Sequence, residues 1–123
     1  MVRTSRPLRE LAAVIRSKNA KPYRLTLDII FEDISVFRHV RDSGVLNAAS
    51  VAELYGIPAD SIVSSFIFEP GLAFKFTLKR PHVQGALGET DMYGAQQHVP
   101  LLDVEVPWSE SAPTFVRKAR TIA

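Results

Sequence analysis

The sequence of 123 residues contains no cysteine, and this absence excludes several kinds of chemistry at once. Without a thiol the chain can form no disulfide, use no cysteine nucleophile and build no thiolate metal site. The absence also fits a reducing compartment. A chain of this length can bury enough apolar surface to fold as one domain without a disulfide or a metal ion.

The sequence also lacks long apolar runs and a strong charge of either sign. No stretch approaches the roughly 20 apolar residues of a membrane-spanning helix, and no signal-peptide pattern opens the chain, so we expect a cytoplasmic protein. The 15 basic and 13 acidic side chains leave a net charge of only +2. The basic excess lies near the two ends, around Arg3 and Arg9 and around Lys118 and Arg120. We expect solvated termini there rather than a nucleic-acid-binding face.

Hydrophobic periodicity predicts a mixture of helices and strands. We expect helices at 7–15, 32–44 and 47–56 and strands at 23–31, 61–68, 72–80 and 101–106. The polar run RSKNAKP, at 16–22, is predicted as a turn, and 82–100 as a long irregular segment. The strict alternation in LAFKFTLKR favours an antiparallel sheet with one face open to water.

The order of these elements predicts an α+β two-layer sandwich. Its antiparallel or mixed sheet of about four strands would carry two or three helices on one face, in a ferredoxin-like order. A single α+β domain is expected at 7–107, after a polar leader at 1–6 and before a mobile tail at 108–123. Trp108 and Phe115 are the apolar anchors of that tail, and they could dock on the domain or on a partner.

The first polar cluster outside the periodic pattern is Arg16, Ser17, Lys18 and Asn19. Basic side chains beside unpaired backbone N–H groups in a loop can hold a carboxylate or a phosphate. The alternative is a solvated basic turn without a function of its own.

The second cluster lies in the stretch TDMYGAQQHVPLLD, within a segment too long for an ordinary connection. Asp91 and His98 could form an acid–base pair, because a carboxylate can orient an imidazole that titrates near neutrality. Tyr93 could donate a hydrogen bond to an oxyanion. Two amides, Gln96 and Gln97, could bind a carboxylate or an amide. The alternative is structural: the Tyr packs, and the Gln and His side chains satisfy backbone groups.

Asp28 interrupts an otherwise apolar strand, and a charge there is either exposed or paired. We expect a cross-strand ion pair with Arg24 and with Lys75 or Lys79 rather than a catalytic role. No metal site is predicted, because the three histidines have no ligand-like spacing. No cofactor is expected either, since the chain has no glycine-rich phosphate loop.

Four stretches carry a family resemblance: LRELAAVIRSKNAKPYRLTLDIIF, ELYGIP, FEPGLAFKFTLKRP and GETDMYGAQQHVPLLDVEVP. They span 7–107 and resemble a small bacterial family known as domain of unknown function 4387, with YGAQQH as the most specific run. That family is similar to AtuA-like proteins of acyclic terpene utilisation and is often encoded beside them or fused with them. The large AtuA-like proteins carry a C-terminal domain described as ferredoxin-like. The resemblance therefore implies a ferredoxin-like fold and an AtuA-like partner, and it implies no established reaction.

The leading hypothesis is an accessory small subunit that docks on an AtuA-like large subunit and helps form a site for an organic acid or its acyl-CoA ester. Arg16 and Lys18 would neutralise a carboxylate or phosphate, Tyr93 and the two Gln side chains would orient it, and His98 would exchange a proton. This hypothesis requires the two polar clusters to meet at one rim of the domain, with Lys18 close to His98.

Three alternatives remain open from the sequence. The first is a non-catalytic protein-interaction module whose long loop is the interface, and the second is a stand-alone lyase, hydratase or isomerase. A nucleic-acid binder comes last, because we expect the open face of the sheet to lack exposed aromatic side chains on which bases stack. The sequence leaves open the identity of the ligand, the existence of a reaction and whether the chain forms homo-oligomers.

Overall fold

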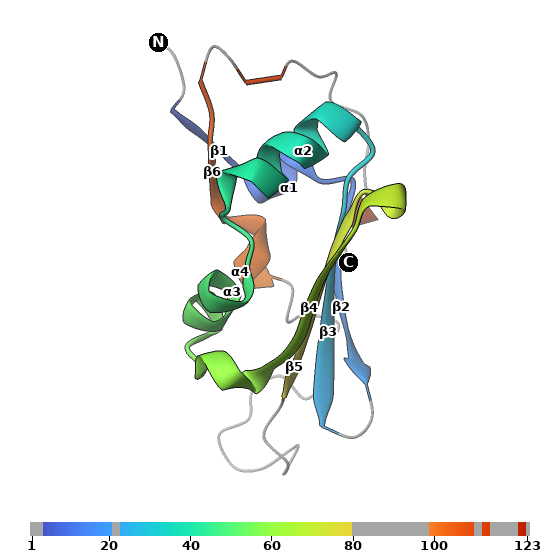
Figure 1. Cartoon of the computed structure of the whole chain (residues 1–123), viewed down its shortest axis with the longest axis vertical. Helices are drawn as coiled ribbons and strands as arrows, with labels where there is room; N and C mark the ends of the chain where they lie inside the picture. Colours follow the sequence, from blue (N-terminus) through green and yellow to red (C-terminus); the bar gives the residue numbers. More distant parts are fainter. Residues whose placement is uncertain (1–3, 21–22, 80–98, 110–111, 114–120, 123) are drawn as a thin grey trace.

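The computed structural model describes residues 4–20, 23–79, 99–109, 112–113 and 121–122. Its elements form two layers, with helices α2 (Ile34–Ser43) and α3 (Ala48–Tyr55) on one side of a twisted main sheet (Figure 1). This arrangement confirms the predicted α+β class. The opposite face of the main sheet carries no α-helix among the described residues, and we call it the open face.

The described part of the main sheet has the strand order β4-β5-β3-β2-β7. The strands are β2 (Val14–Ala20), β3 (Arg24–Ile30), β4 (Ile62–Phe68), β5 (Ala73–Lys79) and β7 (Thr121–Ile122). Neighbours from β4 to β2 are antiparallel, whereas the short β7 runs parallel to β2. Because β2 and β3 are joined directly as a hairpin rather than through a helical crossover, the predicted ferredoxin-like topology is not confirmed.

A second, two-stranded sheet joins the two ends of the described domain. Strand β1 (Ser5–Pro7) pairs antiparallel with β6 (Glu105–Pro107). Two one-turn helices, α1 (Leu8–Leu11) and α4 (Val99–Leu102), contact each other beside it. Segments about 100 residues apart in the sequence are therefore held together at the side of the domain away from the open face (Figure 1).

Both long helices lie within the predicted ranges 32–44 and 47–56. Asp33 caps α2 by accepting hydrogen bonds from two backbone N–H groups of its first turn, and Gly44 follows the helix in the left-handed conformation. Asn47 and Ser50 form a capping box at the start of α3, and Gly56 ends that helix in the same way as Gly44 ends α2. No helix among the described residues has the length and apolar character needed to cross a membrane.

The hydrophobic core lies between the main sheet and the helices. The rings of Phe31, Phe37 and Phe74 meet there with centroids 5.4 to 6.1 Å apart, in tilted and edge-on geometry. Alternate positions of β3 and β5 complete the sheet side of the core: Leu25, Leu27, Ile29, Phe76 and Leu78. Two short 3-10 helices, η1 (Ala59–Ser61) and η2 (Glu69–Gly71), stand at the two ends of β4.

The largest correction to the sequence prediction is β2. The helix predicted at 7–15 is limited to α1, and the first part of the predicted turn at 16–22 is a strand that pairs with β3 along its whole length. A strand needs only one apolar face when the other face is open to water. In β2 the side chain of Ile15 is buried on the helix side and that of Arg16 is exposed on the open face. A mainly polar sequence can therefore form this strand.

The strand predicted at 101–106 is also shorter than expected. Helix α4 occupies its first two positions, and β6 occupies only its last two. The side chains at this end still alternate, since Val106 is buried while Asp103 and Glu105 are exposed.

Trp108 packs on the domain rather than extending from it. His39 of α2 lies edge-on to the indole, with ring centroids 4.7 Å apart, and the Arg6 guanidinium lies 5.5 Å from the indole centroid. An N–H at Nε2 of His39 donates to the backbone oxygen of Pro107 at 2.8 Å. Trp108 is therefore an anchor on the body, whereas Phe115 lies outside the described residues.

Two phenylalanines on opposite faces of the main sheet make a matched test of this fold. We predict that Phe74→Ala lowers the free energy of unfolding by about 3–5 kcal/mol, because it opens a cavity in the core. Phe66→Ala, on the open face, should cost less than about 1 kcal/mol. Urea denaturation followed by circular dichroism measures both values, and equal losses would contradict the assignment of the two faces.

Candidate functional site

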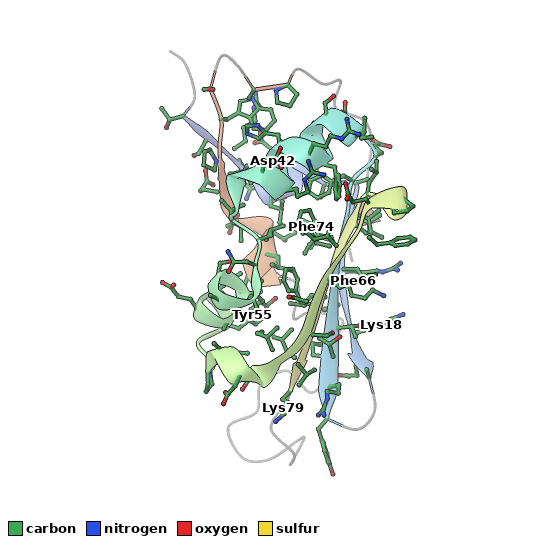
Figure 2. All side chains as sticks on the ribbon, in the orientation of Figure 1. Lys18, Asp42, Tyr55, Phe66, Phe74 and Lys79 are labelled. Carbon is green, nitrogen blue, oxygen red and sulfur yellow. The ribbon has the colours of Figure 1, made fainter. Side chains whose placement is uncertain are left out.

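The open face is built from alternate residues of four antiparallel strands. Because paired residues of neighbouring strands point to the same side, the register places Phe66, Lys75, Asp28 and Arg16 in one row across β4, β5, β3 and β2. Figure 2 shows Phe66 and Lys18 pointing away from the helices, whereas Phe74 points toward them.

Asp28 is the centre of this row and is almost completely buried, with 3% of its surface exposed. Its Oδ2 accepts a hydrogen bond from Nε of Arg16 at 3.0 Å, and its Oδ1 lies 3.4 Å from Nζ of Lys75. The predicted cross-strand ion pair is thus confirmed for Lys75, while Arg16 replaces the expected partner Arg24. The register explains the replacement, because Arg16 lies directly opposite Asp28 on the neighbouring strand.

One atom of this carboxylate has unused hydrogen-bonding capacity. Asp28 Oδ1 is shielded from solvent and accepts no hydrogen bond within the described structure, although the Lys75 ammonium lies nearby as a counter-ion. A buried carboxylate oxygen in this condition is destabilising unless a donor reaches it. The Lys75 ammonium, 3.4 Å away, is a donor group that offsets part of this cost.

A cavity of about 400 Å³ lies on the open face beside this row. Its lining residues are Arg16, Asp28, Ile30, Phe66, Phe68, Gly71, Ala73 and Lys75. The volume suits a small organic molecule or one part of a larger one. The cavity combines apolar walls with two cations and one carboxylate, which is the mixture that fixes the orientation of a small ligand.

The apolar wall consists of two phenylalanines that remain largely exposed, Phe66 at 53% and Phe68 at 49%. Their rings stack with centroids 6.1 Å apart and an interplanar angle of 26°. The Phe68 ring lies against Gly71, where an added Cβ atom would meet the ring at 2.7 Å. Gly71 is therefore required for the position of Phe68, because any larger residue would displace the ring from the cavity.

This wall corrects the expectation that the open face lacks exposed aromatic side chains. Phe66 and Phe68 follow Ser64 at alternate positions of β4, and the shift of register between Ile62 and Ser64 turns all three toward the open face. A β-bulge changes the face to which later side chains point, and the sequence carries no clear signal for this one. The i, i+2 spacing of the two phenylalanines is the signal that could have located the wall.

The four residues of the first predicted cluster do not lie together. They alternate along β2, with Arg16 and Lys18 on the open face and Ser17 and Asn19 directed to the helix side. Ser17 is buried there, opposite Leu27. The structure thus brings the two basic residues to one surface and separates them from their polar neighbours.

The predicted residues of the second cluster lie outside the described residues. They are Asp91, Tyr93, Gln96, Gln97 and His98. Their approach to Lys18, which the leading hypothesis requires, stays a prediction. Within the described ranges no group of three or more His, Cys, Asp or Glu side chains is arranged to hold a metal ion.

The two described groups with shifted pKa values lie away from the cavity. Burial raises the pKa of the Tyr55 hydroxyl on α3, so this phenol stays protonated at neutral pH. A hydrogen bond to Asp42 raises the pKa of Arg41, and Glu69 adds to the effect. Arg41 therefore links the end of α2 to η2, which is a structural role.

The central part of the chain matches a protein family without an assigned function. The family model is described as Domain of unknown function (DUF4387), and it matches residues 8–105. The matched segment contains both long helices and strands β2 to β5. No curated protein and no solved structure matches the chain.

Two basic residues of β2 make a matched test of the buried carboxylate. We predict that Arg16→Gln lowers the free energy of unfolding by about 1–2 kcal/mol, because it removes a charged hydrogen bond to Asp28. Lys18→Gln, two positions along the same face, should change it by no more than about 0.5 kcal/mol. Urea denaturation at neutral pH compares the two. An equal effect of both variants would show that Asp28 does not depend on Arg16.

Proposed function

Because the chain belongs to the DUF4387 family, we propose that it is an accessory small subunit that docks on an AtuA-like large subunit and helps form a site for an organic acid or its acyl-CoA ester. The association with AtuA-like proteins rests on the sequence resemblance that is most specific at YGAQQH. The ferredoxin-like similarity of such domains rests on the same resemblance.

The observation that carries the ligand class is the group of charges beside the cavity. Arg16 and Lys75 both contact Asp28, so two cations surround one carboxylate and leave an excess of positive charge. Only Nε of Arg16 bonds to Asp28, and its terminal nitrogens remain as donors for a second anion. A carboxylate or a phosphate supplies the missing negative charge and presents two oxygens that a guanidinium binds through two parallel N–H groups.

The apolar wall supports an organic body attached to that anion. Phe66 and Phe68 offer ring surface on one side of the cavity, and Ile30 and Ala73 line it as well. The apolar part of such a ligand would bury area against these side chains. Since both phenylalanines are about half exposed, the chain alone encloses such a ligand incompletely, and a second protein would close the site.

The edge of the main sheet offers a place for that second protein. Within the described residues β4 pairs only with β5, so its outer backbone groups have no strand partner. Val63 and Ile67 are exposed on this strand together with the two phenylalanines. An exposed apolar edge strand invites aggregation unless another chain covers it, and partners commonly dock by adding a strand to such an edge.

In this proposal the residues of the second predicted cluster complete the chemistry. Tyr93 and the Gln side chains would orient the ligand, while Asp91 and His98 would move a proton. A hydratase, lyase or isomerase step at an acid or thioester would suit such groups. Arg16 and Lys75 would hold the ligand during that step and need not react.

A second candidate function is a non-catalytic protein-interaction module. The exposed apolar residues of β4 favour an interaction module, because they could form a protein interface without any ligand. These residues are Val63, Phe66, Ile67 and Phe68. Trp108 no longer supports this alternative, since its ring packs against His39 on the same chain. The two functions differ in whether the assembled complex binds a small acid. A stand-alone enzyme would instead turn over a small acid or thioester without a partner.

The docking step has a direct test. We predict that the chain co-elutes with an AtuA-like protein encoded beside it in size-exclusion chromatography, and that Ile67→Glu abolishes the co-elution by placing a charge on the β4 edge. Ile34→Glu is the matched control, because Ile34 is equally exposed but lies on α2. The proposal is wrong if the wild-type chain does not co-elute or if both variants behave alike.

The ligand step is tested on the assembled complex. Arg16→Gln should weaken the binding of the organic acid or ester at least about tenfold by calorimetry, whereas Arg38→Gln on α2 should leave it unchanged. If the complex forms but binds no acid or ester, the interaction module is the correct function. The same conclusion follows if the complex is active and His98→Ala and Tyr93→Phe leave that activity intact.

A further inference from the structure

The open face carries a one-sided distribution of charge. Five basic side chains occupy its alternate positions on β2, β3 and β5, whereas Asp28 is the sole acidic side chain among the described residues of this face. The basic residues are Arg16, Lys18, Arg24, Lys75 and Lys79. Since the whole chain has a net charge of only +2, this face holds a basic surface that the overall composition conceals.

We infer that the open face binds a nucleotide moiety, with its base at the phenylalanine wall and its phosphates on the basic residues along the strands. In the acyl-CoA ester of the proposed function, on which this inference rests for its choice of ligand, the moiety is the 3′-phospho-ADP end. The acyl end would then extend toward the partner.

The wall supports a planar base. Aromatic side chains on an open sheet are a common platform for bases, because every base has a π-face that stacks on a ring. Phe66 and Phe68 are exposed and stacked on each other, so a base can lie on the outer ring surface without separating the pair. Gly71 holds the second ring in place by leaving room for it.

The unused oxygen of Asp28 supports a ligand with a hydrogen-bond donor beside its planar group. Oδ1 is buried and accepts no hydrogen bond in the described structure, and Asp28 is one of the residues that line the cavity. An exocyclic amine of a base or a ribose hydroxyl would supply the donor. A simple fatty acid has no such group, so this oxygen favours a nucleotide over a plain carboxylate.

The register of the sheet supports the placement of the phosphates. Side chains on one face of a strand repeat every two residues, or about 6.7 Å. One repeat beyond Asp28 the row contains Thr77, Thr26 and Lys18, and two repeats beyond it lie Arg24 and Lys79. A base in the Asp28 row therefore has hydroxyl and ammonium groups at the first step and two more cations at the second. This spacing suits a sugar followed by phosphates.

The arrangement favours one nucleotide over a strand of RNA. Both aromatic residues lie on the edge strand β4, and the central strands β3 and β5 present no aromatic side chain to the open face. Sheets that bind single-stranded RNA stack two or three successive bases on their aromatic residues. The described part of this face has an aromatic platform at one position only, so a longer chain of bases would gain little additional binding.

The test titrates the full-length chain with three parts of the ligand and with RNA, using isothermal titration calorimetry at 50 mM salt. We expect coenzyme A and 3′,5′-ADP to bind with similar affinity and pantetheine not to bind. Phe66→Ala and Lys18→Gln should each weaken 3′,5′-ADP binding about fivefold or more. Raising the salt to 200 mM should weaken the binding of 3′,5′-ADP to the wild-type chain. Arg38→Gln, an exposed cation on α2, is the control and should have no effect. Circular dichroism checks that each variant is folded.

Other outcomes would overturn the inference. No binding of 3′,5′-ADP, or equal loss of binding in the Arg38→Gln control, excludes a nucleotide site on this face. An oligouridine that binds more tightly than 3′,5′-ADP, with affinity rising with length, indicates an RNA surface instead. If the complex with the large subunit binds an organic acid but no nucleotide, the proposed function stands and this inference fails. If the chain binds 3′,5′-ADP but never joins a large subunit, the nucleotide site stands and the proposed function fails.

Discussion

The packing of α2 and α3 against one face of the main sheet is the constraint on which the rest of the structure depends. The alternating apolar residues of β3 and β5 bury their side chains against these helices, and the rings of Phe37 and Phe74 meet in the contact. Because side chains alternate along a strand, this burial decides which residues reach the other face. The row of Lys75, Asp28 and Arg16 exists because its neighbours in the sequence are needed in the core.

Local capping residues and strict apolar alternation explain which parts of the structure could be predicted. The caps at Asp33 and Asn47 and the glycine stops at Gly44 and Gly56 depend on local chemistry, so the sequence determined both helices. The faces of β3 and β5 followed from strict apolar alternation. Strand β2 was missed because both of its faces carry polar residues, Arg16 and Lys18 on the open face and Ser17 and Asn19 on the helix side, and pairing between strands leaves little trace in one sequence.

The candidate site could be predicted only in part, for the same physical reason. Asp28 was recognised as a charge that needs a partner, and Lys75 was named correctly, because a charged residue in an apolar strand has few neighbours. Arg16 was recognised as an anion-binding residue but was assigned to a loop. The phenylalanine wall was missed because a bulge near Ile62 decides the direction of Phe66 and Phe68. A bulge depends on the partner strand, so the sequence of β4 alone does not reveal it.

The buried carboxylate also has a consequence for the whole open face. Replacing Arg16, Asp28 and Lys75 by apolar residues could stabilise the isolated chain, since buried ion pairs often contribute less than a good apolar contact. Such a row would, however, join the exposed rings of Phe66 and Phe68 into an apolar band across four strands. Bands of that size lead to association with other chains. The charged row confines the exposed apolar surface to the edge strand and keeps the centre of the face polar.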